Sequence, residues 1–168
     1  MSIPGTLTCT RVQLGDCPPR RSELGADRVN DRTGGVRPAP LPPAVEARLA
    51  HDPRAWLCTL RPDGSPHVTP VWFVHTGGTW WVGCAEQSVK VRNVLADPRV
   101  SLALEDGIAP VVAEGVVRVW RSDFPAPVVA AFARKYDGWD VRRPEAPQNR
   151  RVLLEIPVRR WLLAGRAQ

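Results

Sequence analysis

The sequence predicts a mainly β fold, a closed or split antiparallel barrel of six strands with short helices at its side. Runs rich in β-branched and aromatic residues recur along the chain, and several alternate large apolar with small or polar side chains. Compact turn sequences join the early runs. No helix of crossover length separates these early runs, which argues against a parallel sheet.

The strands follow from these runs in chain order. Arg61–Ser65 carries strong turn chemistry, because Pro62 presets φ and Gly64 can take a positive φ, so the flanking runs are expected to form a hairpin. Thr76–Thr79 makes a second tight connection. The six expected strands are residues 55–60, 67–74, 80–84, 100–104, 111–120 and 152–156.

Three helices are expected beside the strands. The first opens at Pro42-Pro43, where a proline is tolerated at the first helical position, and runs to Ala50 with Val45 and Leu49 four residues apart. The second opens at Ser88, and the third spans residues 125–136 with an apolar face.

The chain is expected to divide into a tail and one domain. Residues 1–40 mix Gly, Pro, Arg, Asp and Thr without a sustained period, so they cannot bury enough surface to offset the entropy of ordering. We therefore predict a flexible N-terminal tail over residues 1–40, with a structured partner-binding arm as the alternative. The barrel domain is expected over residues 41–168.

Composition narrows the class of protein. The net charge of +6 comes from basic residues spread along the chain, so nucleic-acid binding is not expected. No stretch of about 20 apolar residues and no secretory signal pattern is present, which predicts a cytoplasmic protein without membrane contact. No CxxC pair occurs among Cys9, Cys17, Cys58 and Cys84, so neither a metal site nor a disulfide framework is expected.

The helix that opens at Ser88 is a candidate site for a phosphorylated ligand. A helix N-terminus offers unpaired amide N–H groups and the positive end of the helix dipole, and Lys90 adds a full charge in the first turn. Ser88 could contact the phosphate, or it could simply cap the helix. Asn93 lies three residues after Lys90, so it either shares the ligand face or belongs to a solvated polar face.

Three segments of the chain look familiar together. Residues 60–73, residues 88–94 and residues 97–100 resemble the pyridoxamine 5′-phosphate oxidase-like split β-barrel superfamily, and more narrowly its actinobacterial flavin and deazaflavin oxidoreductase branch. The resemblance covers residues 42–164. It implies a split barrel, a homodimer with cofactors at the subunit interface, and either coenzyme F420, a deazaflavin, as the first choice or FMN as the alternative.

The resemblance also implies where a cofactor would bind. Its phosphate would lie at Lys90, and its flat ring would lie against the backbone of one strand segment, made of His67, Val68, Thr69, Pro70 and Val71. Pro70 cannot donate to a ladder, so this strand is expected to be interrupted there, with an edge strand as the alternative.

Two further positions belong to this expected site. Cys84 stands where the family commonly has a threonine, at the end of the preceding strand. Trp139 follows the last helix in a glycine-containing loop, and it is either a ring-facing group donated across the dimer or an ordinary packing residue.

The sequence offers no catalytic residue of its own. No Ser-His-Asp arrangement, HExxH motif or pair of carboxylates on one helix occurs, so a cofactor would have to carry the reaction. The resemblance implies an F420-dependent oxidoreductase that transfers a hydride to an unsaturated small-molecule substrate. The alternatives are an FMN-dependent oxidase or reductase and a non-catalytic split barrel that binds a cofactor or haem, although His67 is the only histidine near the expected site.

Overall fold

The computed structural model describes residues 40–144, 146 and 149–166. The predicted tail, apart from its last residue, lies outside this range. Three helices and eight strands follow one another as α1 (Pro43–His51), β1 (Ala55–Leu60), β2 (Pro66–Val71), β3 (Phe73–Thr76), β4 (Thr79–Ala85), α2 (Val89–Ala96), β5 (Arg99–Leu104), β6 (Val111–Val116), β7 (Arg118–Trp120), α3 (Ala126–Lys135) and β8 (Arg151–Ala164).

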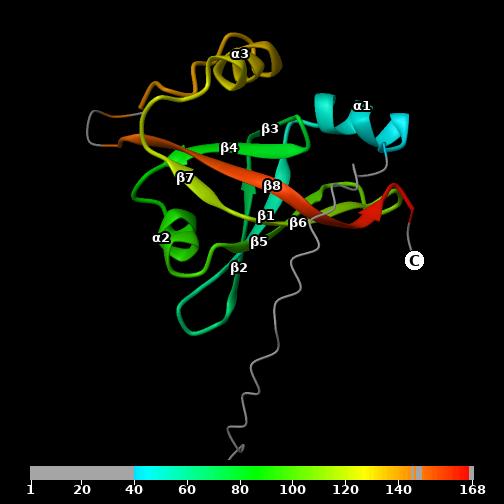
Figure 1. The fold of residues 1–168 in the computed structure, drawn as a ribbon, viewed down its shortest axis with the longest axis horizontal. Helices are drawn as coiled ribbons and strands as arrows, with labels where there is room; N and C mark the ends of the chain where they lie inside the picture. The colour runs from blue at the N-terminus through cyan, green and yellow to red at the C-terminus, as the bar shows by residue number, and fades with distance from the viewer. Residues whose placement is uncertain (1–39, 145, 147–148, 167–168) are drawn as a thin grey trace, which may run out of the picture. The chain divides into compact units, whose positions relative to one another are not determined.

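The strands form one antiparallel sheet that curls into a split barrel, which confirms the predicted fold class. The pairing order is β2-β1-β5-β6-β8-β4-β3, with β7 added to β8. The first half of β8 pairs with β4 on one side and β7 on the other, and its second half pairs with β6 (Figure 1). The helices lie outside the strands, with α2 close to β1.

Two predicted strands are each divided in the structure, which makes eight strands instead of six. The run 67–74 breaks at Trp72, because β2 pairs with β1 whereas β3 pairs with β4. The run 111–120 breaks at Val117, whose N–H leaves the ladder and donates to the carbonyl of Pro98 at 2.9 Å. Pro70 itself lies within β2, opposite Trp56, and β2 is an end strand of the pairing order, as in the edge-strand alternative.

The predicted hairpins are confirmed. β1 and β2 pair in full register through the turn at Arg61–Ser65, where Gly64 has φ of +81° and the Arg61 N–H bonds the Ser65 carbonyl at 2.9 Å. β3 and β4 pair through the connection at Gly77 and Gly78, both with positive φ.

The core has two parts. The larger part fills the barrel with aliphatic side chains and the rings of Phe73 and Trp80, and it receives Val45 and Leu49 from α1. The smaller part lies beneath α3, where Val128 and Phe132 pack with Leu153 of β8. No helix in the described residues is long and apolar enough to cross a membrane.

Candidate functional site

A cavity of about 350 Å³ lies at the split in the barrel. Its walls come from the ends of β2 and β4, the start of α2, the loop after α3 and the start of β8. In the described part of the chain no ladder joins β2 to β4, so their backbones diverge here. The lining residues are Pro70, Val71, Trp72, Gly83, Cys84, Ala85, Ser88, Lys90, Trp139 and Arg151.

Gly83 allows the loop after α3 to approach β4. A Cβ atom added to Gly83 would lie 2.3 Å from Cγ2 of Val141 and 3.4 Å from the ring of Trp139. The first distance is far shorter than a van der Waals contact, and Val141 is fully buried, so only glycine fits. This close packing brings Trp139 to the cavity of its own chain.

Three aromatic residues form a cluster that we call the aromatic wall: Trp72 and Trp139, which line the cavity, and Tyr136, which stacks on Trp72. The rings of Trp72 and Tyr136 stack with centroids 4.6 Å apart and planes 3° apart. Trp139 meets Trp72 edge-on at 5.2 Å. Trp72 is 43% exposed, so the wall offers an accessible indole surface of the kind on which a flat ring can pack.

The start of α2 supplies the polar end of the cavity. Ser88 occupies the N-cap position with φ of −66° and ψ of 152°, but its side chain makes no capping hydrogen bond, so the predicted capping contact is absent. Its Oγ is buried and meets no described residue at hydrogen-bonding geometry, although it lies near enough to the Cys84 thiol to lower the pKa of that thiol. A buried hydroxyl without a partner is costly, and a ligand that accepts its hydrogen bond would remove that cost.

The cavity favours anions. Lys90 and Arg151 contribute two cations, and the ten lining residues include no carboxylate. The Arg151 guanidinium carbon lies 5.2 Å from the Trp139 ring centroid, a cation–π arrangement. Burial raises the pKa of the Cys84 thiol, although Lys90 and Ser88 oppose this, so the thiol adds no negative charge at neutral pH.

The structure brings six of the ten predicted cofactor-binding residues to this cavity. They are Pro70, Val71, Cys84, Ser88, Lys90 and Trp139. The agreement spans four separate segments of the chain, so it depends on the tertiary fold and not on closeness in sequence.

Four predicted residues lie elsewhere. Asn93 is 3% exposed in the core, where its Nδ2 donates to Thr59 Oγ1 at 2.9 Å, so it shares neither the ligand face nor a solvated face. His67 also lies near Thr59, with its Nδ1 3.5 Å from Oγ1. Val68 is exposed on the outer side of β2, and the Thr69 hydroxyl donates to the Pro70 carbonyl at 3.4 Å.

Sequence reasoning missed four lining residues: Trp72, Gly83, Ala85 and Arg151. Arg151 reaches the cavity because β8 pairs with β4, which sets Arg151 opposite Ala85. No local sequence pattern predicts the pairing of β8 with β4. Gly83 could have been found, because a glycine inside an aromatic, β-branched strand often marks a close approach of another segment.

The described residues contain no group of three or more His, Cys, Asp or Glu side chains that could hold a metal ion. The histidines His51, His67 and His75 all lie outside the lining of the cavity. Among the side chains that commonly ligate haem or a transition metal, the described lining of the cavity offers the Cys84 thiol and no histidine or carboxylate.

Comparison with solved structures gives relatives with the same fold. An F420 reductase is 25% identical, with a TM-score of 0.59, and the match covers 72% of this chain and 98% of that one. A conserved hypothetical protein from Mycobacterium tuberculosis is 29% identical, with a TM-score of 0.58, over 73% and 83% of the two chains. The haem storage protein HutZ from Vibrio cholerae, at 17% identity and a TM-score of 0.59 over 71% and 91%, shows the fold alone.

The family comparison is more specific. The family model described as pyridoxamine 5′-phosphate oxidase matches residues 41–164, which include every strand and helix described above and all ten lining residues of the cavity. The chain therefore belongs to the pyridoxamine 5′-phosphate oxidase family of split β-barrel proteins.

Proposed function

We propose that this protein is an F420-dependent oxidoreductase that transfers a hydride to an unsaturated small-molecule substrate. The observation that carries the proposal is the cavity itself, with Lys90 and the unpartnered Ser88 hydroxyl at one end and the aromatic wall at the other. A phosphorylated cofactor with a flat ring has these same two parts. The similarity to an F420 reductase favours the deazaflavin over FMN.

The phosphate end rests on the start of α2. Lys90 supplies a full positive charge, and the first two amides of α2, those of Val89 and Lys90, precede the first amide that bonds the Ser88 carbonyl, that of Val91. The Ser88 hydroxyl is buried and ready to donate to a phosphate oxygen. The Lys90 ammonium, the first amides of α2 and the Ser88 hydroxyl together bind a dianion. Asn93 is not needed, because its side chain is hydrogen-bonded to Thr59.

The ring end rests on the aromatic wall and on the backbone at the split. Trp72 and Trp139 provide apolar surface. The edge of β2 away from β1 and the end of β4 beyond its pairing with β3 provide backbone polar groups, although Pro70 lacks an N–H. When bound, a reduced deazaflavin supplies the hydride. The chain orients the ring, and the product takes its proton from solvent, since neither a carboxylic acid nor a histidine is among the lining residues of the cavity.

The proposal includes a homodimer in the cytoplasm, with each cavity completed by the partner subunit. The outer face of β1 and β2 is apolar, and we call it the outer patch: Trp56, Cys58, Leu60, Pro66, Val68 and Pro70. Trp56 is 42% exposed and Val68 is 55% exposed. Pro70 also lines the cavity, so a second copy that covers the patch would lie beside the cofactor site.

Light scattering tests the homodimer. The unaltered protein should have the mass of two chains, and Val68→Asp should shift it towards one chain, because an unpaired carboxylate would be buried in the interface. Ile108→Asp is the matched control, since Ile108 is also exposed but lies in the loop before β6. A monomeric unaltered protein would remove the homodimer from the proposal.

Cofactor titration tests the function. Cofactor-stripped protein is titrated with F420 and with FMN under identical conditions, and tryptophan and ring fluorescence are followed. We expect tighter binding of F420, and we expect Lys90→Ala to weaken it at least tenfold, about 1.4 kcal/mol. Arg92→Ala is the control on the same helix, because Arg92 is exposed and does not line the cavity.

The outcomes separate the candidates. Tighter binding of FMN would favour the alternative, an FMN-dependent oxidase or reductase, because the phosphate end of the cavity suits either cofactor. Equal effects of the Lys90 and Arg92 substitutions would remove Lys90 from the site. If neither cofactor binds, the hydride-transfer proposal is wrong.

A further inference from the structure

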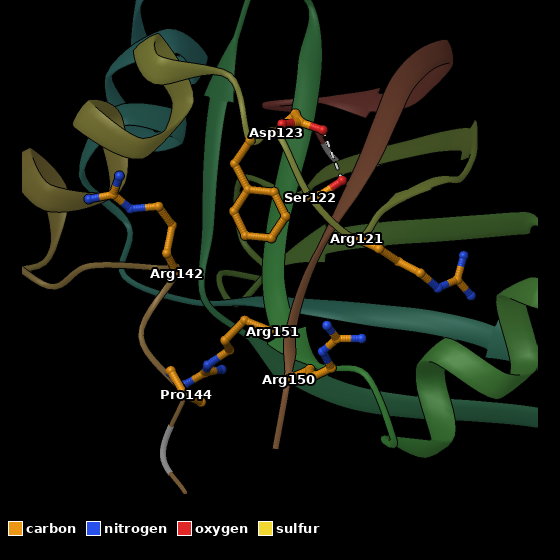
Figure 2. Close-up of a pocket in the computed structure, with 8 residues that line it drawn as sticks. Arg121, Ser122, Asp123, Arg142, Pro144, Arg150 and Arg151 are labelled. Carbon is orange, nitrogen blue, oxygen red and sulfur yellow. Dashed lines mark hydrogen bonds between the residues drawn. The ribbon is translucent and has the colours of Figure 1, made fainter. Parts of the chain in front are cut away.

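A second cavity adjoins the first and is not used by the proposed cofactor site. Its volume is about 340 Å³, and it is lined by Arg121, Ser122, Asp123, Phe124, Arg142, Pro144, Arg150 and Arg151. Figure 2 shows Arg142 and Arg121 on opposite sides of the view, with Arg150 and Arg151 between them and Arg151 beside Pro144. Arg151 lines both cavities, so their occupants would be neighbours.

The charges that line this second cavity are mostly positive. Arg121 pairs with Glu86 at 2.8 Å, and Arg142 pairs with Asp140 at 2.9 Å. Arg150 makes no side-chain hydrogen bond or ion pair with the described residues, so its charge has no protein counter-ion there. Asp123 is the one carboxylate in the described lining, and it accepts a hydrogen bond from Ser122 at 2.9 Å.

The cavity also has an apolar part. The half-buried ring of Phe124 and the ring of Pro144 add apolar surface to a lining that also holds four guanidinium groups. A guanidinium binds a carboxylate through two parallel N–H donors, whereas a neutral amide or alcohol offers no charge to pair. The chemistry that suits this cavity is therefore a carboxylate attached to a flat apolar group.

We propose that the second cavity binds the carboxylate of an aromatic or otherwise flat organic acid, and that this acid is the substrate of the reaction. The second half of the proposal rests on the proposed function. The adjacency through Arg151 supports it, because a hydride acceptor must lie next to the ring that donates the hydride. The substrate class is thereby narrowed to unsaturated carboxylic acids.

Binding of benzoate and its neutral analogue benzamide to the full chain without cofactor tests the carboxylate site. Ligand-observed NMR titrations should show benzoate binding at least fivefold tighter than benzamide. Arg150→Gln should weaken benzoate binding at least fivefold. It should leave the melting temperature unchanged, because the Arg150 side chain has no described partner to lose. Arg142→Gln, which also lines the cavity, should weaken benzoate as well.

Arg160→Gln is the matched control for these titrations. Arg160 is an exposed arginine of β8 that pairs with Glu114 and lies outside both cavities, so this substitution should leave benzoate binding unchanged. Equal binding of benzoate and benzamide, or unchanged benzoate affinity in both the Arg142 and the Arg150 variants, would overturn the carboxylate site.

A second titration tests whether the acid is a substrate. Benzoate affinity is measured again at saturating F420 or FMN, whichever binds, and it should persist because the two cavities are separate. Displacement of benzoate by the cofactor would overturn the substrate assignment, since the arginines would then belong to the cofactor site. A failure of both cofactors to bind would overturn the proposed function, while the benzoate and benzamide comparison would still decide the carboxylate site.

Discussion

The hydroxyl oxygen of Tyr136 lies 2.8 Å from both the backbone N and the backbone O of Phe73. It accepts from the N–H, and it donates its single proton to the carbonyl of Phe73 or to that of Pro53, 2.9 Å away. Phe73 begins β3 just after the break at Trp72. Tyr136 thus provides hydrogen-bond partners for backbone groups of Phe73 at the outer edge of the sheet, where no further strand pairs with β3.

Tyr136→Phe removes these bonds and keeps the ring that stacks on Trp72. The backbone groups of Phe73 would lose their partner in a half-buried place, so we expect the free energy of unfolding to fall by about 1–3 kcal/mol. Urea denaturation measures the change. A substitution that leaves the unfolding midpoint in place would show that solvent satisfies this edge.

Gly83→Ala places a Cβ atom 2.3 Å from Cγ2 of Val141, so the loop that carries Trp139 must move. We expect a loss of stability of about 1–3 kcal/mol together with weaker cofactor binding. Thermal unfolding and cofactor titration of the same preparation measure both. Gly107→Ala is the control, because an added Cβ there meets no atom within 4 Å. Unchanged cofactor affinity in the Gly83 variant would show that Trp139 does not contribute to cofactor binding.

Asn93→Ala separates a core role from a ligand role. Its amide is buried against the Thr59 hydroxyl, so removal leaves that hydroxyl without its donor and should cost about 1–3 kcal/mol of stability. Cofactor affinity, measured below the melting temperature, should change by less than twofold. Unchanged stability together with lost cofactor affinity would instead indicate that Asn93 contacts the cofactor.

The stability of the protein should rise between pH 8 and pH 10 through Lys135. Burial lowers the pKa of Lys135 in the folded protein to about 8, although Asp52 opposes this, against 10.5 for the unfolded chain. In this window the unfolded state binds more protons than the folded state, so the free energy of unfolding increases with pH. Because Lys135 is partly exposed, solvent screens its charge, which limits the increase in the free energy of unfolding to about 1 kcal/mol.

Lys135→Met is the comparison for that window. The melting temperature of the unaltered protein, relative to the variant, should increase by about 4 °C from pH 8 to pH 10. The variant also loses the bond from Nζ to the Leu49 carbonyl at 3.0 Å, so the comparison uses the change between the two pH values and not the difference between the two proteins at one pH. Parallel curves for the two proteins would place the pKa of Lys135 near its ordinary value.

Much of the fold could be predicted because it is encoded locally. The turn at Arg61–Ser65 and the helix start at Ser88 each depend on a few adjacent residues, and the structure has both. The breaks at Trp72 and Val117 could not be predicted in the same way. At Trp72 the chain passes from pairing with β1 to pairing with β4, and at Val117 it leaves β5 and continues along β8, and such pairings are a property of the whole sheet.

The residues of the candidate site also differ in whether local sequence predicts them. Ser88 and Lys90 were identified from the physics of one helix terminus, and both line the cavity. Asn93 was placed by helical spacing alone, which gives the position around the helix but not which side faces the core. Arg151 needed the pairing of β8 with β4, which joins residues far apart in the chain.

The long strand β8 also bears on how the chain folds. Its 14 residues pair with β4, β6 and β7, all of which precede it in sequence. On a ribosome, the earlier strands would emerge before the segment that joins them, so the barrel could close only after β8 has emerged. Contacts over such sequence separations slow folding and leave strand edges unpaired in the meantime. The nascent chain is then most prone to aggregate just before residues 151–164 emerge.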